Sequence, residues 1–170
     1  MRRTIIIIAA LLLGGAAFLF FDATRVNHVR KESSAPVFKV SDAISGKALS
    51  SSDLKNKIIF VNFWASWCQP CKEEMPSIEA LYREMTGNDD FRMVTILYRD
   101  SAENAFEYMK SRGYTFPVYI DPNGSAARDY GVTGVPETYI VDKKGALARR
   151  VIGGADWSSP DEKNLIKALF

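Results

Sequence analysis

The chain has 170 residues, of which 47% are hydrophobic and 25% are charged, a composition typical of a folded protein rather than a disordered one. Its length suits one compact domain with an appendage, because single domains commonly have about 100 to 150 residues. Two of the 22 Lys and Arg residues precede residue 4, which leaves 20 basic against 20 acidic residues in the remainder. That balance excludes the basic surface that nucleic-acid binding requires.

A long uncharged segment opens the chain. Thr4 to Phe21 is eighteen residues without a charge, preceded by Arg2 and Arg3. As a helix it would measure about 27 Å, close to the roughly 30 Å of a bilayer core. The apolar part of a cleaved signal peptide has about 7 to 15 residues. The segment here is longer, and it ends in bulky side chains. We therefore expect residues 1–21 to be an uncleaved single-pass membrane anchor, with the rest of the chain extracytoplasmic, on the periplasmic side.

A polar stretch separates this segment from the expected domain. Residues 22–35 lack periodicity and end at Pro36, so we interpret them as a linker to a domain of residues 36–170. The run IIFVNF at 58–63 is almost entirely apolar, which is typical of a strand covered on both faces. A helix is predicted from Gln69 to Met85, because Met75 and Ile78 fall on one face of it.

The remaining segments alternate between strand and helix signals. The predicted elements are, in chain order, strands at 37–40 and 47–49, a strand at 91–98, a helix at 101–112, a strand at 116–120, a short helix at 125–130, a hairpin turning at 143–145 and a last helix capped by Ser158 or Ser159. Parallel pairing is expected where a helix links two strands. The order predicts an α/β fold with a mixed central β-sheet flanked by helices on both faces.

Both cysteines lie in the motif WCQPC, as Cys68 and Cys71. A disulfide that closes so short a loop stabilises a protein little, so a redox role is the better interpretation. Cys68 lies at the predicted helix N-terminus, where free N–H groups and the helix dipole lower a thiol pKa. We expect Cys68 to attack a substrate disulfide and Cys71 to resolve the mixed disulfide. Gln69 and Pro70, between them, would tune the redox poise.

The same spacing is also half of a zinc site. A closed site needs four ligands, whereas the chain has no third cysteine and a single histidine, His28, in the expected linker. We therefore expect no metal centre and no cofactor other than the redox-active Cys68–Cys71 disulfide. A module that uses the two thiols to bind a metal or haem is the alternative from a different functional class.

Three separated motifs, VNFWAS, WCQPC and GVPETYIVD, together resemble the thioredoxin superfamily. More narrowly, the chain from Pro36 onward is similar to the membrane-tethered TlpA/ResA group of thiol-disulfide oxidoreductases, with CcmG (DsbE) as a relative. This resemblance implies a thioredoxin-like fold, a reducing direction, and electrons from an integral membrane thiol carrier of the CcdA or DsbD kind. It further implies apocytochrome c, with an oxidised C-x-x-C-H, as substrate. Reduction of the copper site of an oxidase is the alternative within the group, and a monomer is expected.

The resemblance also assigns substrate binding to Trp67, Val135, Pro136 and Glu137. It implies a cis Val135–Pro136 bond beside the cysteines, whose exposed backbone can pair with an extended substrate; an ordinary Gly-x-Pro loop is the alternative. Glu137 is expected either to shape the acidity near the substrate or to be a surface charge on an edge strand. Arg150 is interpreted as part of a solvated strand end.

Asn62 departs from ordinary thioredoxins, which the resemblance indicates place a buried, proton-handling aspartate there. In the TlpA/ResA group this role passes to a glutamate after the second cysteine, which by spacing is Glu74. Glu74 lies three residues after Cys71 and four before Ile78, on the side of the apolar stripe. A desolvated carboxyl group there would have a raised pKa and could exchange a proton with a cysteine, whereas a solvated glutamate is the alternative. Trp157 is interpreted as a cap on the last helix.

Overall fold

The structure is a computed structural model that describes residues 33–170. The expected anchor, residues 1–21, and residues 22–32 of the expected linker lie outside the described residues. Within 33–170, no helix combines the length and the apolar character that a membrane crossing needs. The end of the expected linker pairs with the domain, since Ser34 forms a β-bridge with Ala146 and the Ala35 N–H donates to the Gly145 carbonyl at 2.9 Å.

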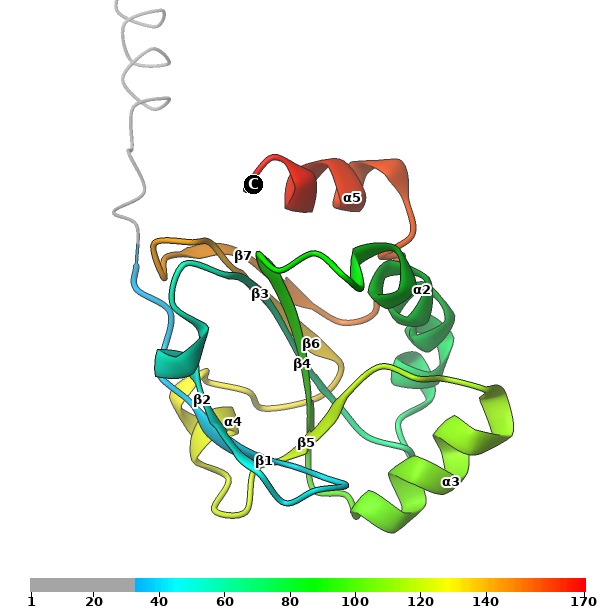
Figure 1. Ribbon diagram of the computed structural model, residues 1–170. Helices are drawn as coiled ribbons and strands as arrows, with labels where there is room; N and C mark the ends of the chain where they lie inside the picture. Colours follow the sequence, from blue (N-terminus) through cyan, green and yellow to red (C-terminus); the bar gives the residue numbers. More distant parts are fainter. Residues whose placement is uncertain (1–32) are drawn as a thin grey trace, which may run out of the picture. The chain divides into compact units, whose positions relative to one another are not determined.

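The described part of the chain forms one seven-stranded mixed sheet (Figure 1). Across the sheet the strands are β2 (Ala48–Ser50), β1 (Lys39–Asp42), β5 (Val118–Ile120), β4 (Phe91–Leu97), β3 (Ile58–Trp64), β6 (Glu137–Val141) and β7 (Leu147–Ile152). Strands β3, β4 and β5 are parallel, whereas β6 is antiparallel to β3. The C-terminal ends of β3 and β4 and the start of β6 therefore meet at one edge, where ligand sites of α/β sheets usually lie.

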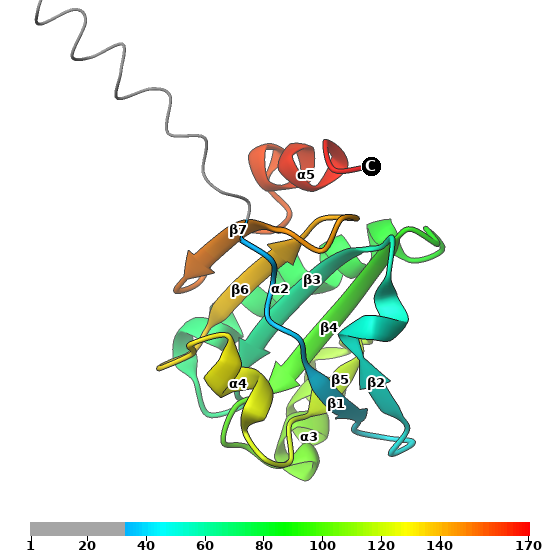
Figure 2. The same ribbon diagram turned by 90° about the vertical axis from the view of Figure 1, so that its left-hand side faces the viewer.

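Helices cover both faces of this sheet, as Figure 2 shows. The core on one face takes in side chains of α2 (Gln69–Met85), α3 (Ala102–Arg112) and α5 (Pro160–Lys167). The other face packs against α4 (Ser125–Asp129) and the 3-10 turn η1 (Ser51–Leu54). Along β3, Phe60 and Trp64 join the α2 face, and Val61 and Phe63 join the α4 face. Because side chains alternate along a strand, Asn62 lies on the α2 face.

The predicted mixed sheet with helices on both faces is confirmed, and so are the bounds of α2. The side chain of Cys68 caps α2 at its N-terminus, and Ser159 caps α5, with Pro160 as its first residue. The first strand is displaced from the predicted 37–40 to Lys39–Asp42. The position of this strand depends on its hydrogen bonds to β2 and β5. The local sequence alone cannot predict these partners.

Candidate active site

Cys68 and Cys71 form a disulfide in the turn between β3 and α2. Cys68 is the N-cap residue of α2, and its Sγ accepts a hydrogen bond from the Cys71 N–H at 3.1 Å. A helix N–H directed at sulfur favours a thiolate once the disulfide is reduced. Cys68 is 4% exposed, whereas Cys71 has no exposed surface. Cys68 is therefore the cysteine of the pair that a substrate can reach.

Several of the residues assigned to substrate binding lie around this disulfide. Trp67 is 58% exposed, and its Nε1–H donates to the carbonyl of Arg99 at 3.2 Å. The Val135 carbonyl oxygen is 3.4 Å from Cys68 Sγ, and the Val135–Pro136 bond is cis, as expected. The structure thus brings Trp67 and the residue before the cis-proline to the two sides of Cys68.

The two residues between the cysteines are exposed. Gln69 donates from Nε2 to Oε1 of Glu73 at 3.1 Å, and Pro70 occupies the second position of α2. Neither side chain hydrogen-bonds to a cysteine sulfur within residues 33–170, so the influence of these residues on the redox poise stays a prediction.

Glu74 is a buried carboxyl group, 3% exposed, one turn beyond Cys71. Its Oε1 accepts from Asn62 Nδ2 at 3.0 Å, and its Oε2 accepts from the Ala155 N–H at 3.2 Å and from Trp157 Nε1 at 3.3 Å. Burial raises the pKa of Glu74 to about 7, although these three donors favour the carboxylate. The alternative of a solvated glutamate is therefore wrong. Close to pH 7 this group can both take up and release a proton.

The residues that hold Glu74 come from distant parts of the chain. Asn62 also donates from Nδ2 to Thr138 Oγ1 at 2.8 Å, which joins β3 to β6 beneath the carboxyl group. Trp157 is fully buried and packs edge-to-face on Phe60, with ring centroids 4.9 Å apart. The interpretation of Trp157 as a helix cap was wrong, because its indole is part of the core and its N–H binds Glu74. No local signal could reveal this contact, which spans 83 residues.

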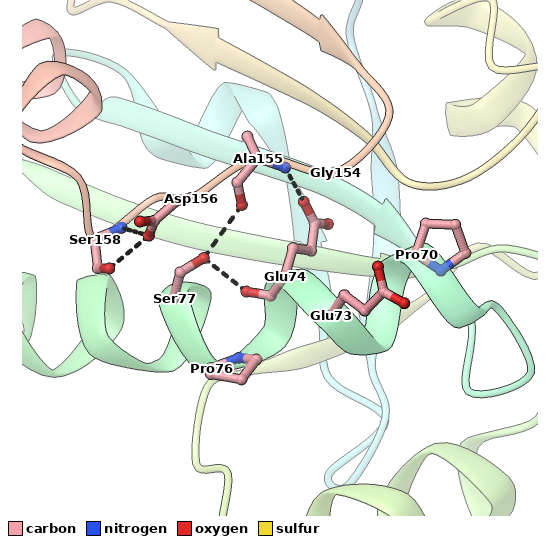
Figure 3. A pocket seen from close by; sticks show the side chains of 9 residues that line it. All are labelled: Pro70, Glu73, Glu74, Pro76, Ser77, Gly154, Ala155, Asp156 and Ser158. Atoms are coloured by element: carbon pink, nitrogen blue, oxygen red, sulfur yellow. Dashed lines mark hydrogen bonds between the residues drawn. The ribbon is translucent and has the colours of Figure 1, made fainter.

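A cavity of about 580 Å³ opens beside Glu74, between the start of α2 and the segment 154–158 (Figure 3). Glu74 points toward Ala155 there, and Ser77 bridges the two segments through its hydroxyl. Gly154 lies close to α2, since a Cβ at that position would be 3.3 Å from the Pro70 carbonyl oxygen. Glu74 is therefore one of the residues that line this cavity.

Glu137 follows the cis-proline and is also buried, at 2% exposure. Its Oε1 accepts hydrogen bonds from the Tyr139 hydroxyl and from Arg150 Nε, both at 2.6 Å. The alternative of an exposed charge on an edge strand is wrong, because β6 lies between β3 and β7. Arg150 is paired rather than simply solvated. Since Thr138 contacts Asn62 on the α2 face, Glu137 points to the opposite face, and its assignment to substrate binding stays a prediction.

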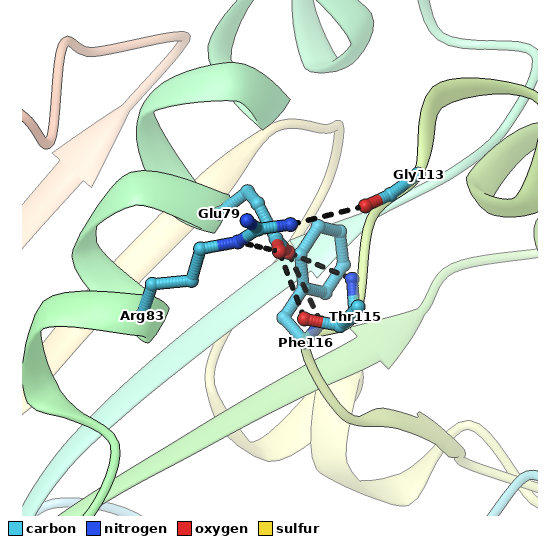
Figure 4. A network of polar contacts seen from close by, with 5 residues as sticks. All are labelled: Glu79, Arg83, Gly113, Thr115 and Phe116. Carbon is cyan, nitrogen blue, oxygen red and sulfur yellow. Dashed lines mark hydrogen bonds and ion pairs between the residues drawn. The ribbon is translucent and has the colours of Figure 1, made fainter.

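A second buried carboxylate on α2, Glu79, contrasts with Glu74 (Figure 4). It accepts hydrogen bonds from Arg83 Nε at 2.6 Å, from the Thr115 N–H at 2.8 Å and from the Phe116 N–H at 3.2 Å. Arg83 also donates to the Gly113 carbonyl at 3.3 Å. Burial alone would raise the pKa of Glu79, but these hydrogen bonds outweigh it and hold the pKa below its ordinary value. Glu79 therefore ties α2 to the loop before β5 as a carboxylate that is ionised at neutral pH.

Replacing Glu79 with alanine is expected to lower the free energy of unfolding by about 2–3 kcal/mol, because the buried Phe116 N–H loses its acceptor. This decrease in the free energy of unfolding should have its full size at neutral pH. It should become smaller below about pH 4.5, where the carboxyl group of the unfolded chain becomes protonated. Urea unfolding measures it. Glu73→Ala, an exposed glutamate on the same helix, is the matched control and should change stability by less than about 0.5 kcal/mol. Equal effects of the two variants would contradict the assignment.

Comparisons with known proteins agree with this geometry. The AhpC/TSA family model matches residues 32–150, a span that contains the cysteine pair, Glu74 and the cis-proline. The thiol-disulfide oxidoreductase ResA of Bacillus subtilis (strain 168) is 34% identical over 140 residues, which cover 82% of this chain and 77% of that protein. ResA of Bacillus anthracis is 34% identical over 155 residues, covering 87% and 86%. A solved thiol:disulfide interchange protein of the thioredoxin family from Chlorobium tepidum TLS superposes with a TM-score of 0.70 at 27% identity, covering 82% of this chain and 97% of that one.

Proposed function

This chain belongs to the AhpC/TSA family and is a thiol-disulfide oxidoreductase of the ResA type, and from that premise we propose that it reduces protein disulfides through Cys68 and Cys71. The observation that carries the proposal is the position of Cys68 Sγ. This sulfur caps α2 and accepts the Cys71 N–H, and Cys68 is the residue of the pair that has exposed surface. These features favour a thiolate at Cys68 that is within reach of a substrate, as the attacking thiol of such a reaction must be.

The reaction follows from this asymmetry. In the dithiol form, the Cys68 thiolate attacks one sulfur of the substrate disulfide and releases the other substrate sulfur as a thiolate. Cys71, as a thiolate, then attacks Cys68 Sγ and releases the second substrate sulfur. Two electrons pass to the substrate, and the enzyme ends as the Cys68–Cys71 disulfide.

Glu74 is proposed to handle the proton of the buried thiol. Cys71 has no exposed surface, so bulk water cannot deprotonate it efficiently. The carboxyl group of Glu74 lies one turn along the same helix and has a pKa of about 7, which suits it to accept the Cys71 proton and to return it to solvent through the adjoining cavity.

Substrate binding is proposed along the edge that Cys68 shares with the cis-proline. The Val135 backbone beside Cys68 Sγ can pair with an extended substrate strand, and the exposed face of Trp67 can pack on it. Pro136 fixes the direction of the Val135 backbone. Gln69 and Pro70 are proposed to tune the redox poise, and Glu137, through its ion pair with Arg150, to affect the charge near the substrate.

The uncharged segment Thr4 to Phe21 supports a cellular setting for this reaction. We propose that it anchors the enzyme in the membrane, with the catalytic domain extracytoplasmic and re-reduced by an integral membrane thiol carrier of the CcdA or DsbD kind. The proposed substrate is the oxidised C-x-x-C-H of apocytochrome c before haem attachment.

Covalent trapping in cells tests this proposal. A full-length Cys71→Ser variant should accumulate as a mixed disulfide with apocytochrome c through Cys68, and the Cys68→Ser/Cys71→Ser variant should trap nothing. A copper-site assembly protein as the trapped partner would move the enzyme to oxidase maturation. Absence of any covalent partner, together with one tightly bound Cu(I) or Zn per reduced domain, would favour the metal-binding module instead.

A further inference from the structure

A second cavity, of about 570 Å³, lies at the same sheet edge as the cysteines. Its walls come from the segment at the end of β4, from α4 and from the loop that leads to the cis-proline. Figure 2 shows α4 beside the edge where β3 and β4 end. None of the roles assigned above to the active site uses this cavity, which we call the arginine subsite after the two arginines in its wall, Arg99 and Arg128.

The charge of the arginine subsite is positive. Arg99 and Arg128 are both exposed, and neither takes part in an ion pair within residues 33–170. Asp121 also lines the cavity, but its carboxylate is committed to the backbone, since it accepts from the Ser125 and Ala127 N–H groups, both at 3.0 Å. The two guanidinium groups are therefore available to an anion from outside.

Asp100, which follows Arg99 in the chain, does not neutralise it. The two oxygens of Asp100 accept the N–H groups of Ser66 and Ser101, at 2.6 and 2.8 Å. The guanidinium of Arg99 instead lies over the ring of Tyr98, 5.1 Å from its centroid. This stacking limits the motion of the guanidinium, and its N–H donors have no hydrogen-bond acceptor within residues 33–170.

The arginine subsite is continuous with the proposed substrate-binding edge on both sides. On one side, the carbonyl of Arg99 accepts the Nε1–H of Trp67, the residue before Cys68. On the other side, Thr133 lines the cavity two residues before Val135, whose carbonyl lies beside Cys68 Sγ. Arg99 has a φ of 51°, a left-handed conformation that a non-glycine residue adopts at a cost and that often occurs at binding sites.

We propose that the arginine subsite binds a carboxylate side chain of the protein substrate, a few residues from the cysteine under attack, and so directs the enzyme to disulfides with acidic flanks. The proposal rests on the proposed attack by Cys68, because a substrate strand paired with Val135 would continue past Thr133 into the cavity. Two arginines suit a carboxylate, which each guanidinium can bind through paired N–H donors. An Asp or Glu side chain is the anion that a protein substrate itself supplies.

Peptides that contain one C-x-x-C disulfide test the proposal. In each peptide of the series, the positions on either side of the cysteines are glutamine, except for a single glutamate. The position of this glutamate differs from one peptide to the next. At one or two positions, glutamate should raise kcat/KM for reduction by the dithiol enzyme about three- to tenfold, mainly through KM. High salt should remove the preference, because the arginines are exposed. The Arg99→Gln/Arg128→Gln variant should lose the preference yet reduce the all-glutamine peptide at the wild-type rate.

Two further variants separate specific binding from a general charge effect. Lys144→Gln removes one positive charge at an exposed site near the start of β3, on the opposite sheet edge, and should keep the preference. Arg128→Glu should instead favour a peptide with lysine at the same position. The proposal is overturned if no glutamate position differs from glutamine, or if Lys144→Gln weakens the preference as much as the arginine variants do. Failure of the proposed function would differ, since the wild type would then reduce none of the peptides.

Discussion

Cys68→Ser is expected to reduce substrate disulfides no faster than the uncatalysed reaction, whereas Cys71→Ser is expected to complete the first attack and then stop. The difference arises because only Cys68 both caps α2 and has exposed surface. Without Cys68 no thiolate meets the substrate. Without Cys71 the mixed disulfide at Cys68 has no internal thiol to resolve it.

Steady-state reduction of a protein disulfide with a small dithiol as the electron source measures both variants. Cys68→Ser should show no turnover and no covalent adduct. Cys71→Ser should show a rapid single adduct per enzyme, followed by slow release that depends on the concentration of the added dithiol. If Cys71→Ser and Cys68→Ser form adducts equally fast, the division of roles is wrong.

Glu74→Gln is expected to slow resolution of the mixed disulfide by about 10²-fold, the lower range of what a positioned general base contributes. The substitution can be accommodated by turning over the Asn62 amide, so that its Oδ1, which has no hydrogen-bond partner within residues 33–170, replaces Nδ2 and accepts from the amide at position 74. Wild-type resolution should rise with pH through about 7 as Glu74 ionises. The variant should lack this rise. Stopped-flow measurement of substrate thiol release gives the rate of resolution at each pH. Glu73→Gln, a substitution of an exposed glutamate on the same helix, is the control.

The same carboxyl group makes a separate prediction about stability. Folding raises the pKa of Glu74 from 4.5 to about 7, so the folded protein holds this proton more tightly than the unfolded chain. The stability from this proton is fully present below about pH 4.5 and is lost as the pH rises through 7, a change of about 3 kcal/mol. Urea unfolding of the disulfide form at several pH values should show this decline in the wild type but not in Glu74→Gln. Identical pH dependence in both would show that folding does not raise the pKa of Glu74.

Much of the fold could be predicted because local patterns and tertiary structure agree. The apolar run at 58–63 can be stable only where both faces are covered, and the apolar face that contains Met75 and Ile78 predicts the helix α2. The burial of Glu74 followed from its place on the apolar stripe of the same helix. These inferences need only the periodicity of one segment.

The parts that could not be predicted depend on contacts between distant segments. Glu137 is adjacent to the cis-proline, but its burial results from β7 and from Arg150, thirteen residues away. Trp157 reaches Glu74 only because the segment after β7 returns to α2. The left-handed conformation of Arg99 likewise becomes visible only in the structure. The position is neither a glycine nor an asparagine, so the sequence does not indicate it.

We expect the Cys68–Cys71 dithiol to reduce a substrate disulfide by an attack from Cys68. The most direct measurement mixes reduced enzyme with a peptide carrying an oxidised C-x-x-C-H, counts thiols on both molecules, and maps the peptide linked to the Cys71→Ser variant by mass spectrometry. This mechanism predicts two peptide thiols for each enzyme disulfide formed, and a peptide bound to Cys68. A peptide that keeps its disulfide in the presence of the fully reduced enzyme would contradict it.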